Sequence, residues 1–369
     1  MKVLQPSALF DSTYIPPKIL FREDEQRTVK KLIDDATEDN FPLNLIVFGI
    51  RGVGKTVLGN FSLKRQLNQK IIPIYVDTYL KTEFEIIREI GSNLGIAYRD
   101  SQDIIWKYIQ KISLEKPYKI VIMLDSINTQ TNRNMTKIIR KIKDAHMHAF
   151  SVMNFNNYLV MKKDLKRQNL LDFILGLDTY SEKELMEITK QKIELAFPRE
   201  LRREIIEFIT DVVAEFDLAR PATVVEILKM LYPVVSNGKD VTAPLVRQAY
   251  DELEILGDDY FKVIEEFNSY SRLQMNFLKL VLKHFEKTGK PYIKEDKLIS
   301  LFQSAVIETQ QGIVPSKFLS ETLEFFQEDR IVLRSRINPL KYFIVHAPTN
   351  LLHILDSIVN SNDTENTFF

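Results

Sequence analysis

The segment Gly49–Thr56 constrains the fold of this chain more than any other, because it reads G-I-R-G-V-G-K-T and fits the pattern G-x-x-x-x-G-K-[ST] without substitution. Glycines at these places let backbone amides curl around a triphosphate, the lysine reaches the terminal oxygens, and the threonine hydroxyl ligates Mg²⁺. The β-branched run Asn44–Phe48 precedes it and a helical pattern, Val57–Lys64, follows. These flanks favour a nucleotide site over a glycine-rich turn without a ligand. The residues that we expect at the nucleotide are Gly49, Arg51, Gly52, Val53, Gly54, Lys55, Thr56 and Val57.

Composition narrows the class of protein. The chain has 369 residues, enough for two or three domains, and a net charge of zero, so a nucleic-acid partner would need local basic patches. Cysteine is absent, which excludes disulfides, thiolate metal sites and cysteine nucleophiles. The sequence shows neither a signal-peptide stretch nor a run of about 18 apolar residues. We therefore expect a cytoplasmic protein that does not contact a membrane.

Apolar runs alternate with helical patterns from Leu45 to about Phe173, which predicts an α/β domain with a parallel sheet wrapped by helices. The predicted strands after the first are Ile71–Val76, Lys119–Leu124 and Ala149–Met153, and the predicted helices between them are Thr82–Leu94 and Asp100–Ile112. After Tyr180 the pattern becomes all-helical, with predicted helices Ser181–Ala196, Pro198–Phe216, Pro221–Leu231 and Ala243–Leu256. Ser181 and Glu184 form a capping-box signal at the start of this region.

A third region follows. Helical patterns continue to His284 and beyond, and then come a predicted strand Arg330–Arg336, a turn at Asn338-Pro339 and a strand Tyr342–Val345. Helices followed by a strand, a turn and a strand are typical of a winged helix. The sequence therefore predicts three domains: an α/β domain at 1–178, a helical lid at 179–256 and a winged helix at 257–369.

A phosphate loop of this kind needs a second strand that ends in an acid, which supports Mg²⁺. The run Lys119–Asp125 supplies Asp125, so the expected metal ligands are Thr56 and Asp125. The alternative is that Asp125 only caps the segment that follows it. Ser126 stands where many such ATPases carry a glutamate that activates water, and a serine cannot serve as that base at neutral pH. We therefore expect weak hydrolysis at best.

Two more residues are candidates for contact with the phosphates. Asn154 ends the next predicted strand, where it would hydrogen-bond the γ-phosphate or its water, while Asn156 and Asn157 fit an ordinary turn. Arg220 opens a predicted helix of the second domain, and its guanidinium suits phosphate oxygens. A solvated arginine at a helix end is the alternative for Arg220. The catalytic candidates are thus Asp125, Asn154 and Arg220.

The order of these features resembles the AAA+ replication initiators of archaea, the origin-recognition and cell-division-control family. The stretch Leu9–Pro16 followed by Arg22-Glu23 is similar to the opening segment of that family. The resemblance implies that this segment contacts the adenine and ribose of ATP or ADP through Tyr14, Ile15, Pro16 and Arg22. It also implies that Asn154 and Arg220 are the two sensor residues. The chain departs from the family at Ser126 and in its short wing turn.

The winged helix suggests a DNA interface. Its helix-turn-helix is expected at Lys294–Glu308 and Val314–Asp329, with the second helix in the recognition position. The candidate DNA-binding residues are Ser316, Lys317, Arg334, Arg336 and Lys341. The recognition helix also carries Glu321, Glu324, Glu328 and Asp329, which phosphates repel unless they point away. A solvated strand or a protein-binding module is the alternative.

These features predict an ATP- or ADP-binding AAA+ replication-initiator-type protein that binds duplex origin DNA through its winged helix and ATPase face. Nucleotide with Mg²⁺ would act as a switch, with slow or absent hydrolysis. The alternative is a signalling or partner-regulating ATPase whose winged helix binds protein. A third possibility is an active ATPase that positions water with Asn128 or Asn154. The resemblance further implies other initiator subunits or a replicative helicase as partners, and association with the nucleoid.

Overall fold

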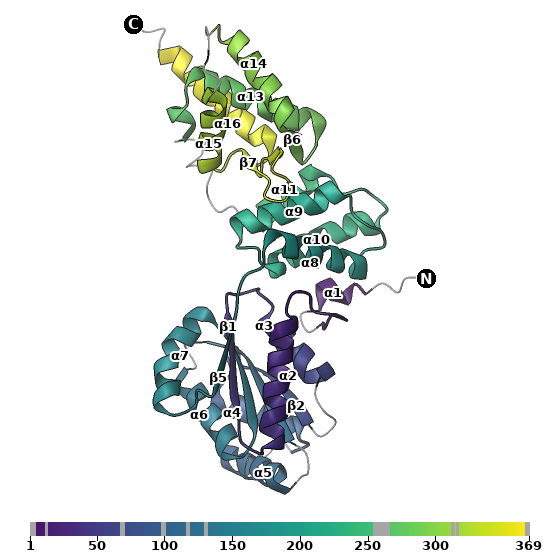
Figure 1. Cartoon of the computed structure of the whole chain (residues 1–369), viewed down its shortest axis with the longest axis vertical. Helices are drawn as coiled ribbons and strands as arrows, with labels where there is room; N and C mark the ends of the chain where they lie inside the picture. The colour runs from purple at the N-terminus through teal and green to yellow at the C-terminus, as the bar shows by residue number, and fades with distance from the viewer. Residues whose placement is uncertain are drawn as a thin grey trace. The chain divides into compact units, whose positions relative to one another are not determined.

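The computed structural model describes residues 5–11, 14–66, 71–96, 101–115, 119–128, 132–253, 266–310, 314 and 317–365. The chain divides into two compact units (Figure 1). The sheet unit runs from Asp11 to Thr179, and the helical unit joins Met1–Phe10 to Tyr180–Phe369. The division at 178 and 256 into three domains stays a prediction.

The sheet unit is built on five parallel strands in the order β2-β3-β4-β1-β5. They are β1 (Asn44–Gly49), β2 (Ile71–Asp77), β3 (Lys119–Ile127), β4 (His148–Asn154) and β5 (Phe173–Leu177). The predicted apolar runs form the first four: β1, β3 and β4 are buried almost throughout, and β2, at the edge of the sheet, is partly buried. Strand β5 was not predicted, since its short run FILGL contains a glycine and is only partly buried.

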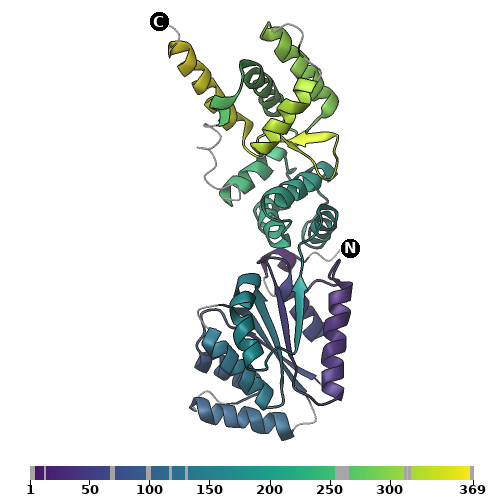
Figure 2. The same cartoon turned by 60° about the vertical axis from the view of Figure 1, so that its left-hand side comes forward.

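Helices lie on both sides of this sheet (Figure 2). They are α2 (Glu23–Glu38), α3 (Lys55–Phe61), α4 (Glu83–Asn93), α5 (Gln102–Glu115), α6 (Asn132–Asp144) and α7 (Phe155–Arg167), and a π-helical turn, Ser62–Gln66, extends α3. The alternative that Asn156 and Asn157 are turn residues is excluded, because both lie in α7. Buried Tyr158, Met161 and Leu165 recur at helical spacing and hold this helix on the sheet.

The helical unit begins with short helix α1 (Ser7–Phe10), α8 (Glu182–Ala196), α9 (Arg203–Phe216), α10 (Pro221–Ser236) and α11 (Ala243–Glu252). The predicted capping box of Ser181 and Glu184 is present at the start of α8. The predicted start of α9 at Pro198 is wrong by five residues. The chain between α8 and α9 is not helical and buries the side chains of Phe197 and Leu201.

The C-terminal part of the helical unit is a winged helix. Its helices are α13 (Arg272–Thr288), α14 (Glu295–Glu308), α15 (Lys317–Glu328) and α16 (Pro348–Glu365), and its antiparallel strands are β6 (Tyr292–Lys294), β8 (Lys341–Phe343) and β7 (Leu333–Arg334), in that order. The wing strands are shorter than predicted. The sequence analysis predicted neither β6 nor α16. Strand β6 is only three residues long, which is too short for a recognisable alternation of apolar residues. In the described part of the chain, no helix is long and apolar enough to cross a membrane.

Candidate nucleotide site

The glycine-rich loop between β1 and α3 makes a tight turn at the carboxyl end of the sheet. Gly54 has a φ of 99°, a conformation that L side chains rarely adopt, and directly precedes α3. A Cβ on Gly49 would lie 2.7 Å from the carbonyl oxygen of Leu177 in β5, so a larger residue would push the strands apart. Such a turn brings backbone N–H groups to the position where phosphate-binding loops hold their ligand.

Lys55 points from the start of α3 back across this loop. Its side chain is buried, and Nζ donates hydrogen bonds to the carbonyl oxygens of Gly49 at 3.1 Å and Ile50 at 2.6 Å and to Asn154 Oδ1 at 3.2 Å. Burial lowers the pKa of Lys55 to about 8, although the charge of Asp125 raises it. A desolvated ammonium among neutral oxygens favours an anionic partner.

Thr56 and Asp125 form the neighbouring wall. Thr56 Oγ1 donates to Asp125 Oδ2 at 2.8 Å, and the hydroxyl of Tyr75 donates to the same oxygen at 3.1 Å. Burial raises the pKa of Asp125, while the hydrogen bonds from Thr56, Ser126 N–H and Tyr75 lower it. A hydroxyl and a carboxylate side by side are oxygen ligands of the kind that Mg²⁺ takes beside phosphates, so the residues fit this metal. Bound Mg²⁺ would neutralise phosphate charge.

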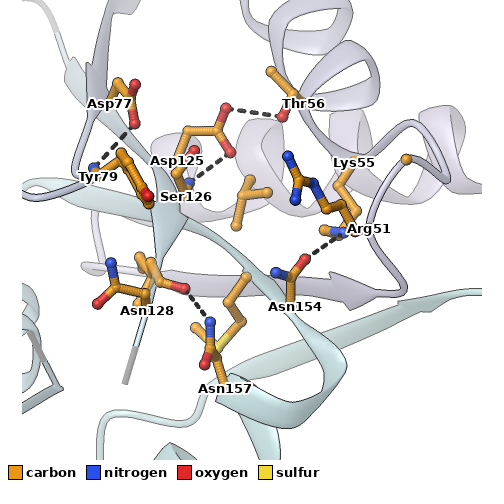
Figure 3. Close-up of a pocket in the computed structure, with 14 residues that line it drawn as sticks. Arg51, Lys55, Thr56, Asp77, Tyr79, Asp125, Ser126, Asn128, Asn154 and Asn157 are labelled. Carbon is orange, nitrogen blue, oxygen red and sulfur yellow. Dashed lines mark hydrogen bonds between the residues drawn. The ribbon is translucent and has the colours of Figure 1, made fainter. Parts of the chain in front are cut away.

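These residues surround a cavity of about 520 Å³ at the carboxyl edge of the sheet (Figure 3). It is lined by Arg51, Gly52, Lys55, Thr56, Asp77, Tyr79, Asp125, Ser126, Ile127, Asn128, Val152, Met153, Asn154 and Asn157. The sheet order explains this gathering, because β3, β4 and β1 are adjacent and end at one edge. The structure therefore brings Lys55, Thr56, Asp125 and Asn154 together.

Ser126 is exposed to this cavity and has a φ of 58°. Its backbone N–H donates to Asp125 Oδ1 at 2.8 Å. The residue occupies the place expected for a water-activating glutamate, but a hydroxyl offers no proton acceptor of suitable strength. The immediate neighbour of Asp125 therefore supplies no base.

No protein-family model matches the chain. The chain is 23 % identical to the ORC1-type DNA replication protein 1 of Sulfolobus acidocaldarius, over 70 % of this chain and 69 % of that protein. Proteins of the same name from other archaea match as well. The chain is thus similar to archaeal ORC1-type DNA replication proteins over about 70 % of its length.

Solved structures agree on the fold. Cdc6p from Pyrobaculum aerophilum superposes with a TM-score of 0.80 at 16 % identity, covering 98 % of this chain and 99 % of that one. The Aeropyrum pernix ORC1 protein, solved in complex with DNA, superposes with a TM-score of 0.58 at 18 % identity, covering 96 % of each chain. The likeness shows the fold: an α/β unit on a parallel sheet, followed by helices and a winged helix.

The opening segment carries the residues that we expect at the adenine and ribose: Tyr14, Ile15, Pro16 and Arg22. They lie outside the lining of the cavity. Arg22 is buried, donates to Glu25 Oε1 at 2.8 Å and also donates to the carbonyl oxygen of Asp178 at the end of the sheet unit. This arginine therefore ties the opening segment to the chain after β5, and its contact with a nucleotide stays a prediction.

Arg220, the predicted second sensor, belongs to the helical unit, where it is the N-cap of α10. Its guanidinium forms an ion pair with Asp217, whose second oxygen accepts a hydrogen bond from Thr223. The guanidinium is thus held by its own unit. A role for Arg220 at the phosphates stays a prediction.

Two of the expected DNA contacts are exposed on the winged helix. Lys317 starts α15 and pairs with Glu321 at 2.8 Å, with 81 % of its side chain exposed. Arg334 in β7 is exposed, and its Nε donates to the carbonyl oxygen of Pro339 at 2.6 Å. Ser316 lies outside the described residues. Helix α15 also exposes Glu321, Glu324 and Glu328, so its acids do not turn inward.

The other two expected DNA contacts are engaged by acids of the lid helices. Arg336 pairs with Glu182 of α8 at 3.0 Å and Glu215 of α9 at 2.6 Å. Lys341 pairs with Glu207 of α9 at 3.1 Å and keeps only 15 % of its side chain exposed. Contact of either cation with DNA would require these pairs to open.

Among the polar residues that line the cavity, the sequence did not indicate a site role for Asp77, Tyr79 or Asn157. Asp77 ends β2 and pairs in register with Asp125, two residues before the end of β3. The signal that identified Asp125 and Asn154, a polar residue closing a buried strand, was therefore also present at Asp77. Asn157 donates to the carbonyl oxygen of Ile127 at 2.7 Å, a contact that depends on α7 and has no sequence signal.

Proposed function

We propose that this chain is a nucleotide-switched replication-initiator protein that binds ATP or ADP with Mg²⁺, hydrolyses ATP slowly, and binds duplex DNA through its winged helix and ATPase face. The observation that carries the nucleotide part is the convergence of Lys55, Thr56, Asp125 and Asn154 on one cavity. Other initiator subunits and a replicative helicase are the partners that we infer for such a protein.

The DNA part of the proposal is supported by the likeness to the ORC1 protein solved with DNA and by the exposed cations of the winged helix. Of the four cations that we expect at DNA, Lys317 at the start of α15 and Arg334 in β7 are the two with exposed side chains that no lid acid pairs with. Phosphate contacts of this kind position a protein on a duplex without reading its sequence.

A salt titration of duplex binding, with and without ATP, tests this part. We expect affinity to fall steeply with salt and the double variant Lys317→Ala with Arg334→Ala to lower both the affinity and the slope of log affinity against log salt, by about two for two lost contacts. Lys239→Ala, an exposed lysine of the helical unit after α10, is the control and should leave binding unchanged. Duplex binding that ignores salt and these substitutions would disprove DNA contact by the winged helix.

A second candidate function is favoured by the lid contacts of the wing: regulation of a protein partner. Arg336 and Lys341 are neutralised by lid acids, and a hollow of about 530 Å³ beside the wing is lined by Glu215, Glu324 and Glu328 as well as Arg334 and Arg336. Such a mixed surface suits a basic protein segment better than a phosphate backbone. Under this alternative, the unaltered chain would bind no duplex at low salt while still binding nucleotide.

A further inference from the structure

Asp77 closes strand β2 at the edge of the sheet where the nucleotide cavity opens. The parallel register pairs the Cα of Asp77 with that of Asp125. Residues paired in this way on neighbouring strands point to the same face of a sheet. Two carboxylates from adjacent strand ends therefore line one cavity, and Figure 3 shows Asp77 in the wall that also holds Asp125 and Ser126.

The two carboxylates differ in how their oxygens are used. Asp125 is 3 % exposed, and both of its oxygens accept hydrogen bonds, from Thr56 and Tyr75 on one and from the Ser126 N–H on the other. Asp77 is half-buried, and its Oδ1 accepts the backbone N–H of Tyr79 at 3.1 Å. Within the described residues this is the one hydrogen bond of its carboxylate, so Oδ2 remains available to a water.

The rest of the cavity wall offers no better proton acceptor. Asn128, Asn154 and Asn157 carry amides, which orient water but do not take up its proton. The hydroxyl of Ser126 has the same limitation at neutral pH. Because Asp125 is committed to Thr56 and fits a metal-supporting role, Asp77 is the carboxylate in the lining that is left for the attacking water.

We propose that Asp77 is the catalytic residue that activates water for slow ATP hydrolysis, in place of the glutamate that Ser126 replaces. The proposal rests on the proposed binding of ATP in this cavity. The water oxygen bonds to the γ-phosphorus, the bond from that phosphorus to the β–γ bridging oxygen breaks, and ADP leaves with the electron pair. The proton of the water passes to the Asp77 carboxylate and then to solvent.

The test uses the full chain and the variant Asp77→Asn. Asparagine keeps an oxygen that can accept the Tyr79 N–H but removes the proton acceptor. We expect the single-turnover rate of phosphate release to fall about 100-fold, while ATP and Mg²⁺ affinities measured by calorimetry change less than about threefold. Asp39→Asn, at the exposed C-terminal end of α2, is the matched control and should keep the full rate.

Three results would be decisive against this role. An unchanged rate in Asp77→Asn, or no hydrolysis by the unaltered chain, overturns the proposal. The proposal is also overturned if Asp77→Asn binds Mg²⁺ more weakly and regains the normal rate at saturating Mg²⁺, because Asp77 would then hold the metal rather than the water. If the unaltered chain fails to bind ATP at all, the proposed function itself fails, which the parallel calorimetry distinguishes.

Discussion

The ammonium of Lys55 donates a hydrogen bond to the side-chain oxygen of Asn154, 3.2 Å away, although 99 residues separate them in the chain. The sheet sets this distance, because β1 and β4 are parallel neighbours and their register pairs Gly49 with Asn154. The glycine-rich loop after β1 and the end of β4 therefore meet at the place where the terminal phosphate of a nucleotide would be bound.

Removing the ammonium should remove most nucleotide binding. Lys55→Ala deletes a buried cation whose proposed partner is a phosphate, and a charged hydrogen bond contributes about 1.5–3 kcal/mol, or roughly 10- to 100-fold in affinity. We expect that loss for ATP in a calorimetric titration. Lys64→Ala, an exposed lysine in the π-helical turn after α3, is the control. Equal affinities in the two variants would contradict a phosphate role for Lys55.

Nucleotide affinity should depend on pH through the same lysine. The pKa of free Lys55 is lowered to about 8 by burial, and a bound phosphate would raise it again. Below pH 8 the ammonium is present in both states, so affinity stays constant. Above pH 8 binding must take up a proton, and affinity should fall by up to about tenfold per pH unit. Lys55→Arg, which stays charged, should flatten this profile. A flat profile in the unaltered chain would contradict the lowered pKa.

We expect the packing of the winged helix on the lid helices to depend on Asp211 of α9. Asp211 is buried and accepts hydrogen bonds from the hydroxyls of Tyr292 at 2.7 Å and Ser335 at 2.6 Å, and from the backbone N–H of Arg336 at 3.0 Å. Asp211→Ala leaves these donors buried without an acceptor, which should cost about 3 kcal/mol of unfolding free energy. Urea denaturation measures this cost, and Glu226→Ala, on the exposed face of α10, should change it little.

Acid should destabilise the sheet unit through His148. This side chain is 2 % exposed, its Nδ1 accepts the backbone N–H of Leu43 at 3.3 Å, and burial lowers its pKa from 6.5 to about 4. The contribution of neutral His148 to folding stability is complete above pH 6.5 and is lost as the pH falls towards 4. In that range the histidine takes up a proton in the unfolded chain but stays neutral in the folded one. Between pH 7.5 and 5 we expect a loss of about 2 kcal/mol.

A variant separates this effect from other acid-sensitive groups. His148→Leu should remove most of the difference in urea stability between pH 7.5 and 5. His146→Asn, at an exposed neighbouring position, should preserve it. If both variants retained the full pH dependence, the buried histidine would not be its source.

Local sequence was sufficient where a structural feature depends on consecutive residues. The phosphate loop is one such case, because its glycines, Lys55 and Thr56 are adjacent and their backbone conformation is set by residue type. Strand ends were predictable by a related rule. Buried runs closed by Asp125 and Asn154 converge whenever the strands are parallel, and Asp77 obeyed the same rule without being recognised.

The sequence by itself determined the fold class, the strand ends at Asp125 and Asn154 and the glycine-rich loop after β1, since these follow from short-range pattern and spacing. Only the tertiary structure decided the state of the wing cations. Arg336 and Lys341 read as free DNA contacts along the chain, yet their acidic partners Glu182, Glu215 and Glu207 lie 121 to 154 residues away. Pairing at such separations depends on how helices and wing pack, and no local pattern encodes it.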